Sequence, residues 1–424
     1  MSRYRKCQLQ QEHGQAVGSR WVMHRQTFGA LFVLLGLLLT PEAWGADFYD
    51  LYVSMSGSDS NPCTEAAPCR HIQYAVNVAS PGDTISIGKG TFVEAGGVGI
   101  DKDLVLLGDG IFSTRVTSWT GSVFKVGVGA IVGIAYLQIT GGTGNAGKGG
   151  GIQNDGNLTL GKVWLRKNSA KWGGGIFNSG TLLINESDIA LNTASISGGG
   201  LRNEGYAELR EVRIVKNYAF SGGGIENTHA SGLPAVITYQ SEISHNSGNG
   251  INNWGNMALY NTTVSRNKQM GIFIGDEGST DLIHVTVAEN GGGGLYLRAE
   301  SNNDVVLDNT IIANNAVTQC SLNGGSVGAA GSLISDSTCG SVWGGNLVGV
   351  DPKLGPLKYN GGSTFTHALK KGSPAIDAGD PGLCEEIDQR GVSRSIDGNG
   401  DGTANCDIGA FEYHKALKKP PLEQ

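Results

Sequence analysis

The chain contains 424 residues, of which 68 are Gly, 16% are charged and 39% are hydrophobic. So low a charge excludes intrinsic disorder, and Gly without a strict period of three excludes a collagen-like chain. The residues after position 45 include 26 basic and 36 acidic side chains. This acidic balance argues against nucleic acid or an anionic membrane as the main partner, because both select a basic face.

Residues 1–45 have the pattern of a secretory signal peptide. A 13-residue apolar run at positions 28–40 precedes Ala43-Trp44-Gly45. The alternative is an uncleaved anchor helix, but the run falls short of the ~20 residues that a span needs. We predict cleavage after Gly45, with Met23 as a sufficient start, and no transmembrane span in the mature chain.

The next segment, residues 46–83, is predicted to close the first end of the fold. Ile72, Ala75, Val76 and Ala79 lie on one face of a short helix. Such an apolar face suits the open end of a tube, where it protects the terminal strand edge.

From residue 149 onward the sequence repeats itself, and two markers run in phase. The first is a Gly-rich step that ends in an aliphatic residue, at Ile152, Ile176, Leu201, Ile225, Ile251, Ile272 and Leu295. The second is an aliphatic residue three places before Asn, at Leu165/Asn168, Ile189/Asn192, Ile214/Asn217, Ile243/Asn246, Val264/Asn267, Val287/Asn290 and Ile311/Asn314. A period of about two dozen residues built from short β-branched stretches is typical of a solenoid whose coils stack strand on strand.

The repeats predict an all-β, parallel β-helix solenoid over residues 84–345. Helical repeats are excluded because no segment within a repeat has apolar spacing of three and four without a Gly interruption. Leu182, Ile184 and Ile189 alternate with polar neighbours, which predicts that they face inward. We expect the Asn residues of the second marker to sit at corners in left-handed φ and to form an amide ladder. A second ladder is expected from the Asn residues two places after the aliphatic residue of the Gly step, Asn154, Asn178, Asn203, Asn227 and Asn253.

Three resemblances extend this prediction. The alternation of Gly-Gly-Gly-Ile-x-Asn with Ile-x-x-Asn resembles the repeats of bacterial polymorphic outer membrane proteins, although those favour Phe-x-x-Asn. Residues 71–77, 81–85 and 90–94 resemble the opening of pectate-lyase-like right-handed parallel β-helices. Residues 346–413 resemble the choice-of-anchor module of secreted bacterial β-helix proteins, and a tail at 414–424 follows. The resemblances imply a right-handed β-helix from a bacterium with a small C-terminal capping module, and none fixes a reaction.

The C-terminal segment contains a candidate calcium loop. Asp397, Asn399 and Asp401 supply oxygen ligands at alternate positions, and the intervening Gly residues permit tight curvature. The acid expected at position 12 is absent, because Ile408 stands there with Asp407 one place earlier. We predict a Ca²⁺ site of non-EF-hand type formed by Asp397, Asn399, Asp401 and Asp407, with a plain Asx-rich turn as the alternative.

Six cysteines follow the leader and form three sequence-local couples. We predict the disulfides Cys63–Cys69, Cys320–Cys339 and Cys384–Cys406, which an oxidising compartment permits. Six cysteines allow 15 connectivities in principle. No Cys/His spacing indicates zinc.

The residues just before the corner Asn should form a surface column, because successive coils stack at ~4.8 Å. Lys216, His245 and Arg266 would be neighbours in this column. They could grip an acidic glycan, or supply the base and the cation of a polysaccharide lyase. The alternative is a solvated rim of charges, which is common on a solenoid.

A second outward column follows from the residue between the aliphatic and Asn of each Gly step. It contains Phe177, Arg202, Phe273 and Tyr296, and exposed aromatic rings suit stacking on sugar faces. Singly exposed aromatic residues are also normal on protein surfaces. This column is predicted as a glycan-binding strip.

Together these patterns predict a monomeric protein, secreted or on the outer surface of a bacterium, that binds an extracellular polysaccharide or another surface macromolecule. The alternative is a polysaccharide lyase or related carbohydrate-active enzyme acting on acidic polysaccharide. A hydrolase would need convergent carboxylates, and Glu186 and Glu211 are the neighbouring pair that the repeats place on adjacent coils. The repeats are short and uniform, which favours the binding protein.

Overall fold

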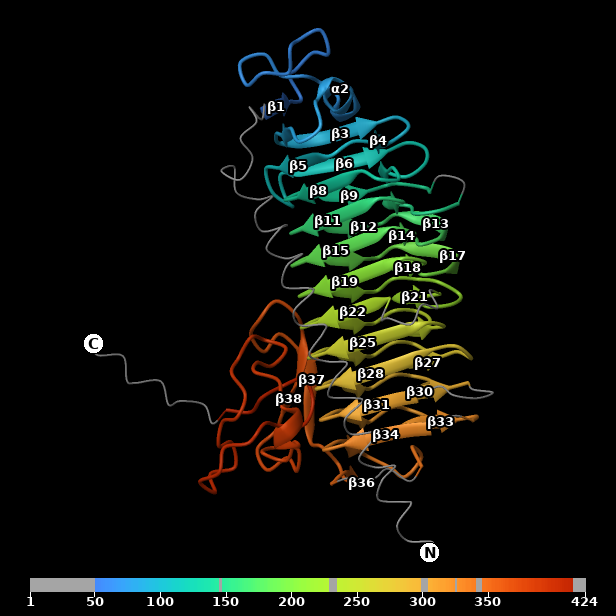
Figure 1. The fold of residues 1–424 in the computed structure, drawn as a ribbon, viewed down its shortest axis with the longest axis vertical. Helices are drawn as coiled ribbons and strands as arrows, with labels where there is room; N and C mark the ends of the chain where they lie inside the picture. Colours follow the sequence, from blue (N-terminus) through green and yellow to red (C-terminus); the bar gives the residue numbers. More distant parts are fainter. Residues whose placement is uncertain are drawn as a thin grey trace, which may run out of the picture. The chain divides into compact units, whose positions relative to one another are not determined.

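The protein is a parallel β-helix in the computed structural model, which describes residues 50–144, 147–228, 235–298, 304–324, 326–340 and 345–414 (Figure 1). The predicted leader and the tail from residue 415 lie outside the described residues. Each coil adds one strand to each of three parallel sheets, which we call sheets A, B and C. The helices of the described residues are α2 (Ile72–Val78) and the 3-10 helix η1 (Pro381–Leu383). The all-β solenoid predicted from the repeats is therefore confirmed.

Within each sheet, consecutive strands along the axis of the coils pair with one another. Sheet A consists of β1 (Asp50–Val53), β2 (Thr84–Ile87), β5 (Leu104–Gly108), β8 (Ile131–Ala135), β11 (Asn157–Gly161), β15 (Thr181–Asn185), β19 (Tyr206–Arg210), β22 (Val236–Tyr239), β25 (Asn256–Tyr260), β28 (Ser279–Ile283), β31 (Asp304–Asp308) and β34 (Ser326–Ala330). Sheet B consists of β3 (Gly90–Glu94), β6 (Thr114–Ser118), β9 (Gln138–Thr140), β12 (Trp164–Arg166), β16 (Asp188–Ala190), β20 (Arg213–Val215), β23 (Glu242–Ser244), β26 (Thr263–Ser265), β29 (Thr286–Ala288), β32 (Ile311–Ala313), β35 (Leu333–Ile334) and β36 (Leu347–Val348). Sheet C consists of β4 (Val98–Ile100), β7 (Phe124–Val126), β10 (Ile152–Asn154), β14 (Ile176–Asn178), β18 (Leu201–Asn203), β21 (Ile225–Asn227), β24 (Ile251–Asn253), β27 (Met270–Ile274), β30 (Gly293–Leu297) and β33 (Cys320–Leu322). Two small pairs remain, the parallel β13 (Ser169–Trp172) with β17 (Thr193–Ser197) and the antiparallel β37 (Leu354–Lys358) with β38 (Thr366–Leu369).

Aliphatic side chains stack in columns along the inside of the coils. Leu182, Ile184 and Ile189 are at most 1% exposed, as the alternating pattern predicted. Ile189 pairs in register with Leu165 on one side and Ile214 on the other. The core is continuous because each coil repeats the same inward positions.

The Gly triplets bend the chain ahead of β10, β14, β18 and β21 of sheet C and keep these coils close. Gly173, the first of its triplet, has φ of 64°, which Gly adopts without steric cost. A Cβ on Gly175, the third of the same triplet, would lie 2.5 Å from the carbonyl oxygen of Gly200 in the next coil. Larger residues at that position would therefore force the coils apart.

Both predicted amide ladders are present, and one detail differs. Nδ2 of Asn192 donates to Oδ1 of Asn217 at 3.0 Å, and the chain of such bonds runs from Asn168 to Asn315. The second ladder joins Asn154, Asn178, Asn203, Asn227 and Asn253. In the last coil the ladder residue is Asn315, because Ile312 and not Ile311 continues the inner column. The predicted Ile311/Asn314 pair is therefore wrong by one residue.

The prediction that the corner Asn residues have left-handed φ is also wrong by one residue. The residue before each Asn, and not the Asn itself, has positive φ, as at Lys216 (56°), His245 (56°) and Arg266 (55°). The bend thus turns the preceding side chain outward and leaves the Asn side chain inside, where it bonds to neighbouring coils. This arrangement puts long side chains on the corner between sheets B and C.

The first coils and the disulfides agree with the sequence-based predictions. The four apolar residues of the predicted helical face, on and just after α2, are at most 5% exposed. The disulfides join Cys63 to Cys69, Cys320 to Cys339 and Cys384 to Cys406. Strand β1 already belongs to sheet A, within the segment that was assigned to the cap.

The C-terminal module, residues 349–414, lies along the flank of the coils and not across their last end (Figure 1). Ser265 on β26 bonds to Nε2 of His367 at 2.8 Å, and Thr263 donates to Gln389 at 2.6 Å. The outward residues of β26, β29 and β32 are buried as a result. The module therefore covers one face of sheet B, whereas the sequence predicted a cap without indicating this position.

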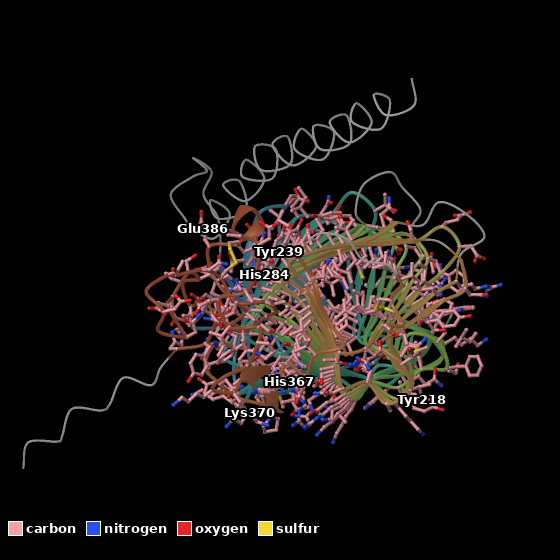
Figure 2. The ribbon with its side chains drawn as sticks, turned by 90° about the horizontal axis from the view of Figure 1, so that it is seen from below. Tyr218, Tyr239, His284, His367, Lys370 and Glu386 are labelled. Carbon is pink, nitrogen blue, oxygen red and sulfur yellow. A yellow bond between two sulfur atoms is a disulfide. The ribbon has the colours of Figure 1, made fainter. Side chains whose placement is uncertain are left out.

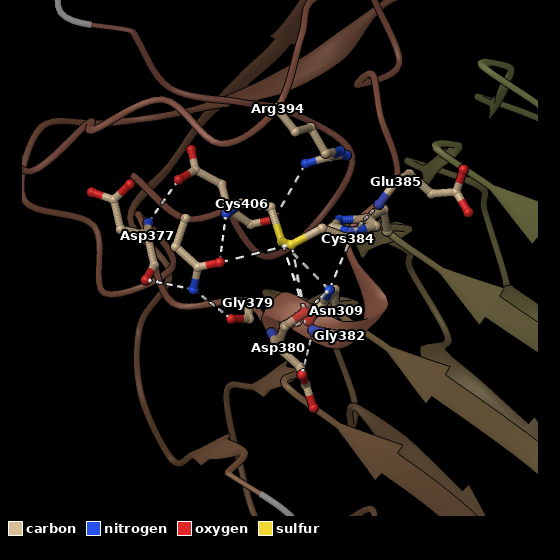
Figure 3. Close-up of a disulfide and its surroundings, with 12 residues drawn as sticks. Asn309, Asp377, Gly379, Asp380, Gly382, Cys384, Glu385, Arg394 and Cys406 are labelled. Atoms are coloured by element: carbon tan, nitrogen blue, oxygen red, sulfur yellow. Dashed lines mark hydrogen bonds between the residues drawn. A yellow bond between two sulfur atoms is a disulfide. The ribbon is translucent and has the colours of Figure 1, made fainter. Parts of the chain in front are cut away.

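Hydrogen bonds of Asn309 and Arg394 join the module to the corner between sheets A and B, beside a disulfide within the module (Figure 3). Oδ1 of Asn309 accepts from the backbone N–H of Asp380 at 2.6 Å, next to the Cys384–Cys406 bridge. Arg394 is 6% exposed and donates to Oδ1 of Asn261 at 2.6 Å. These contacts join residues more than 70 positions apart in the chain.

Candidate functional site

Three parallel columns of side chains cross the outer face of sheet B where the module leaves it open. The first column contains Trp164, Asp188, Arg213 and Glu242. The second contains the small residues Ala190, Val215 and Ser244. The third is the left-handed corner column of Leu191, Lys216, His245 and Arg266. Because the middle column is short, a groove runs along it between taller side chains.

This groove has a volume of about 510 Å³ and is completed by the C-terminal module. Leu357 on β37 and Phe365 just before β38 form its wall. Lys216, His245 and Arg266, which the sequence placed together, all line the groove. Their predicted proximity is thus present in the structure, and their role stays a prediction.

Some charged groups of the groove form ion pairs with other residues, and one does not. Arg213 lies between Glu242 at 2.9 Å and Asp188 at 3.6 Å, beneath the ring of Phe365. Arg266 pairs with Glu289 at 2.6 Å. Lys216 is exposed and forms no ion pair with any residue that the structure describes. Lys216 is therefore the cation most available to a ligand.

His245 is connected to Glu242 through a hydroxyl group. Oγ of Ser244 donates to Oε1 of Glu242, and Nδ1 of His245 lies 3.0 Å from the same Oγ. Nδ1 therefore carries the proton, and Nε2 is left as a free base. Partial burial, followed by the charges of Arg266 and Lys216, lowers the pKa of His245 despite the opposing charge of Glu242. His245 is thus a neutral imidazole at pH 7.

An aromatic pair marks the end of the groove that faces the first coils. The ring of Phe112 meets Trp164 edge-on at 4.7 Å between centroids. The guanidinium of Arg166 lies 5.5 Å from the Trp164 ring. A flat aromatic surface beside a cation is a combination that suits an anionic sugar.

On sheet C, the second outward column is in register as predicted, but Phe177 is not exposed. Phe177 is 1% exposed, and Nζ of Lys148 lies 4.3 Å from its ring centre. The expectation of an exposed Phe177 is wrong because a loop of the preceding coil covers the ring. Arg202 is engaged within its own coil, with Glu204 at 2.9 Å and Ser197 at 2.6 Å.

The rings of Phe273 and Tyr296 stack face to face on neighbouring coils. Their centroids are 5.2 Å apart with an interplanar angle of 5°, and Trp254 lies 5.3 Å beyond Phe273. Both rings are partly buried. Because Phe273 stacks on Tyr296 and also contacts Trp254, this cluster joins successive coils, and sugar stacking on it stays a prediction.

The four residues of the predicted calcium loop already have hydrogen-bond partners. The carboxylate of Asp397 accepts from the N–H groups of Gly400 and Gly402, and Asn399 donates to Asp401 at 3.1 Å. Asp407 is buried and accepts from the N–H of Asp377 at 2.7 Å. Among the described residues, no three His, Cys, Asp or Glu side chains are grouped as a metal site. Calcium binding by this loop stays a prediction.

The predicted acidic residues lie on adjacent coils, because β15 pairs in register with β19, and each has its own partner. Glu186 pairs with Lys162 at 3.4 Å, and Glu211 accepts a hydrogen bond from Ser363 of the module. Both residues have positive φ and belong to the corner between sheets A and B. The module covers the later part of that corner, so the pair does not face the groove.

The sequence did not predict the wall of the groove. A signal was available in the outward positions of sheet B, which change from Trp164 and Arg213 to Thr263 and Thr286. Short hydroxyl side chains in successive coils indicate a face that another segment can cover. Which segment covers it was not readable, because the module lacks the repeat.

One family model agrees with the coil architecture. The family model described as right handed beta helix region matches residues 197–350. A pectate lyase superposes with a TM-score of 0.47 at 14% identity, covering 87% of this chain and 98% of that chain. A mannuronan C-5 epimerase A-module from Azotobacter vinelandii superposes with a TM-score of 0.49 at 15% identity, and the match covers 70% of this chain and 94% of that chain. The catalytic domain of an alpha-1,3-glucanase superposes with a TM-score of 0.42 at 11% identity, and the match covers 73% of this chain and 67% of that chain.

No curated protein matches this sequence. The structural likenesses are too distant to carry an argument about a reaction. In the part of the chain that the structure describes, no helix has the length and apolar character to cross a membrane.

Proposed function

We propose that this protein is an extracellular binding protein that holds an acidic polysaccharide in the groove of sheet B. The observation that carries the proposal is the gathering of Lys216, His245 and Arg266 on one rim of a groove with a floor of small side chains. A local basic rim attracts an anionic polymer even on a chain with a net charge of −7. The three disulfides support residence in an oxidising compartment outside the cytosol.

The groove residues divide the work of binding. Lys216 is free to pair with a sugar carboxylate, and Arg266 can share its guanidinium between Glu289 and the ligand. Trp164 offers an aromatic surface to a sugar ring at the end of the groove. The rise of ~4.8 Å per coil places these groups at regular steps along a linear polymer.

Binding to polygalacturonate at several salt concentrations tests the proposal. Replacing Lys216, His245 and Arg266 together by Ala should weaken binding by more than tenfold, since each lost charge-assisted contact contributes about 1.5 kcal/mol or more. The triple variant should also have a flatter dependence of affinity on salt. A matched control replaces Lys370 and Lys371 by Ala, which removes two positive charges from exposed positions outside the groove.

Two results would contradict the proposal. If the wild-type protein binds no acidic polysaccharide, the proposed function is wrong. If it binds but the triple variant binds equally well, the site lies outside the groove.

A lyase activity is the second candidate, and the chain from Glu242 through Ser244 to His245 is the observation that favours it. Nε2 of a neutral His245 could take the proton on the carbon next to a uronate carboxylate. The electron pair would form the ring double bond, and the glycosidic oxygen would leave with a proton from water. Lys216 and Arg266 would offset the charge on the carboxylate.

The unsaturated product of that elimination absorbs in the ultraviolet, so turnover can be followed directly. His245→Ala should abolish turnover and leave binding largely intact, because a base acts on the proton and adds little to ground-state affinity. Wild-type binding without any rise in absorbance would leave the binding function and exclude the lyase.

A further inference from the structure

The groove on sheet B has a closed end. Its floor runs over Ala190, Val215 and Ser244 on successive strands. The next residue of this column, Ser265, bonds to Nε2 of His367 on β38 at 2.8 Å and, unlike Ser244, does not line the groove. The floor therefore stops between β23 and β26, where the C-terminal module crosses the sheet. Figure 2 shows His367 at the boundary between the module and the coils.

The wall at this end is held from several directions. The backbone N–H of Phe365 donates to Oε2 of Glu242 at 3.1 Å, and its ring covers Arg213 at 4.4 Å. Nδ1 of His367 donates to the carbonyl of Gly355 at 2.7 Å, which ties β38 to β37. These contacts are largely buried, so the wall is a fixed part of the site.

The opposite end of the groove is open. Beyond Ala190 the floor column continues in register through Arg166, Thr140 and Thr117 toward the first coils. These three side chains are partly exposed. The module lies beside the later coils, from β22 onward, and the strands β12, β9 and β6 come before them (Figure 1). A polymer can therefore leave the groove in this direction.

We propose that the groove binds the end of an acidic polysaccharide chain, with the terminal sugar against Leu357 and Phe365. The floor from Ala190 to Ser244 spans two coil steps, about 10 Å at ~4.8 Å per step, which holds a few sugar residues. A chain that continued in both directions along the floor would need the space that β38 occupies. This inference rests on the proposed function and adds which part of the polymer is recognised.

Counting sites on a polymer of varied length tests the inference with the wild-type protein. Polygalacturonate is compared with the same mass of polymer after partial hydrolysis, which raises the number of chain ends. The amount of protein bound at saturation should rise in proportion to the ends. With oligogalacturonates of defined length, affinity should rise by about tenfold for each added charge contact and level off within a few residues.

The outcomes separate the two proposals. Capacity that follows the total mass and ignores the ends would overturn recognition of chain ends and leave the proposed function standing. Absence of binding to every polymer and oligomer would overturn both.

Two variants test the direction of the bound chain. Phe365→Ala keeps the backbone bond to Glu242 and removes the aromatic part of the wall beside Leu357, so it should weaken binding of dimer and hexamer by the same factor. Arg166→Ala acts at the open end and should weaken binding of the hexamer several times more than that of the dimer. Phe220→Ala removes an 84% exposed ring outside the groove and should change neither affinity.

Thermal melts of the three variants establish that they are folded. A Phe365→Ala protein that weakens binding of the hexamer alone would contradict a terminus seated against the wall. If this variant does not fold, the capacity measurement on wild-type protein still decides the question.

Discussion

Single residues in left-handed conformation build the rim of the groove. Such a conformation costs roughly 1–2 kcal/mol for a residue other than Gly. Each rim residue is followed by an Asn whose side chain bonds to two neighbouring coils, and these bonds offset the cost. Asn217, for example, donates to the carbonyl of Ile189 at 2.9 Å and to Oδ1 of Asn246 at 3.2 Å.

Replacing one ladder amide by a carboxylate should therefore weaken the whole fold. Asn217→Asp removes both donors and buries a charge next to Oδ1 of Asn246, so the free energy of unfolding should fall by about 3 kcal/mol or more. Asn314→Asp, at an exposed left-handed corner, is the matched control and should change it by less than about 0.5 kcal/mol. Denaturant unfolding measures both, and equal losses would contradict the register of the ladder.

The pH dependence of binding should follow His245. Its pKa is lowered by partial burial and by the charges of Arg266 and Lys216, so the ring is neutral at pH 7 and gains a proton below its ordinary range. Affinity for an acidic oligosaccharide should rise as the pH falls from 7 to 5, because the rim then gains a positive charge. Calorimetry at several pH values should show this rise in wild-type protein and lose it in His245→Ala. The same rise in both proteins would assign the effect to other groups.

At the scale of strands, sheet B and sheet C use aromatic residues differently. Trp164 presents its ring to the groove on sheet B, whereas Phe273 and Tyr296 on β27 and β30 stack on each other. Stacking along the axis joins successive coils in the same direction as the strand pairing. The sheet C cluster therefore contributes to stability at the point where the second Asn ladder ends, at Asn253 and Thr280.

Phe273→Ala should accordingly lower the free energy of unfolding by about 2–4 kcal/mol, because it removes a partly buried ring that stacks on Tyr296 and contacts Trp254. It should leave the affinity for acidic glycan unchanged, since Phe273 lies outside the groove. Denaturant unfolding and calorimetry on the same preparation test both statements. A loss of affinity without loss of stability would instead support the glycan-binding role predicted for this column.

For the whole molecule, the repeated part was predictable and the added part was not. The period fixed the inward positions of Leu182 and Ile189 because every coil repeats the same burial. The burial of Phe177 depends on Lys148 in a loop that departs from the repeat. The basic rim could be predicted from coil stacking, but its wall could not. The wall depends on pairs such as Ser265 with His367, which are 102 positions apart and follow no periodicity.

Two carboxyl groups close to the contact between module and coils have raised pKa values, Asp407 in the module and Asp308 on β31. Burial, and then the charge of Glu412, raise the pKa of Asp407 to about 8, far above the ~3.9 of an unfolded Asp. The folded state therefore binds a proton between these values that the unfolded state releases. Stability must fall as the pH rises through this window and level off above about 8. Asp308, whose pKa is raised to about 6 by burial and by Asp281, acts in the same direction but only below that value.

The melting temperature should thus decrease between pH 6.5 and 8, and Asp407→Asn should remove most of that decrease because it replaces the proton-binding group by a neutral one of the same shape. Asp308→Asn is the matched control and should leave the decrease of the melting temperature between pH 6.5 and 8 unchanged. The measurement stays above pH 6.5 because burial lowers the pKa values of His284 and His367. At lower pH the unfolded state binds protons that these two residues do not bind in the folded state, so their contribution makes stability rise with pH. If Asp407→Asn retains the full decrease, Asp407 is ionised in the folded protein and its hydrogen bond from Asp377 outweighs its burial.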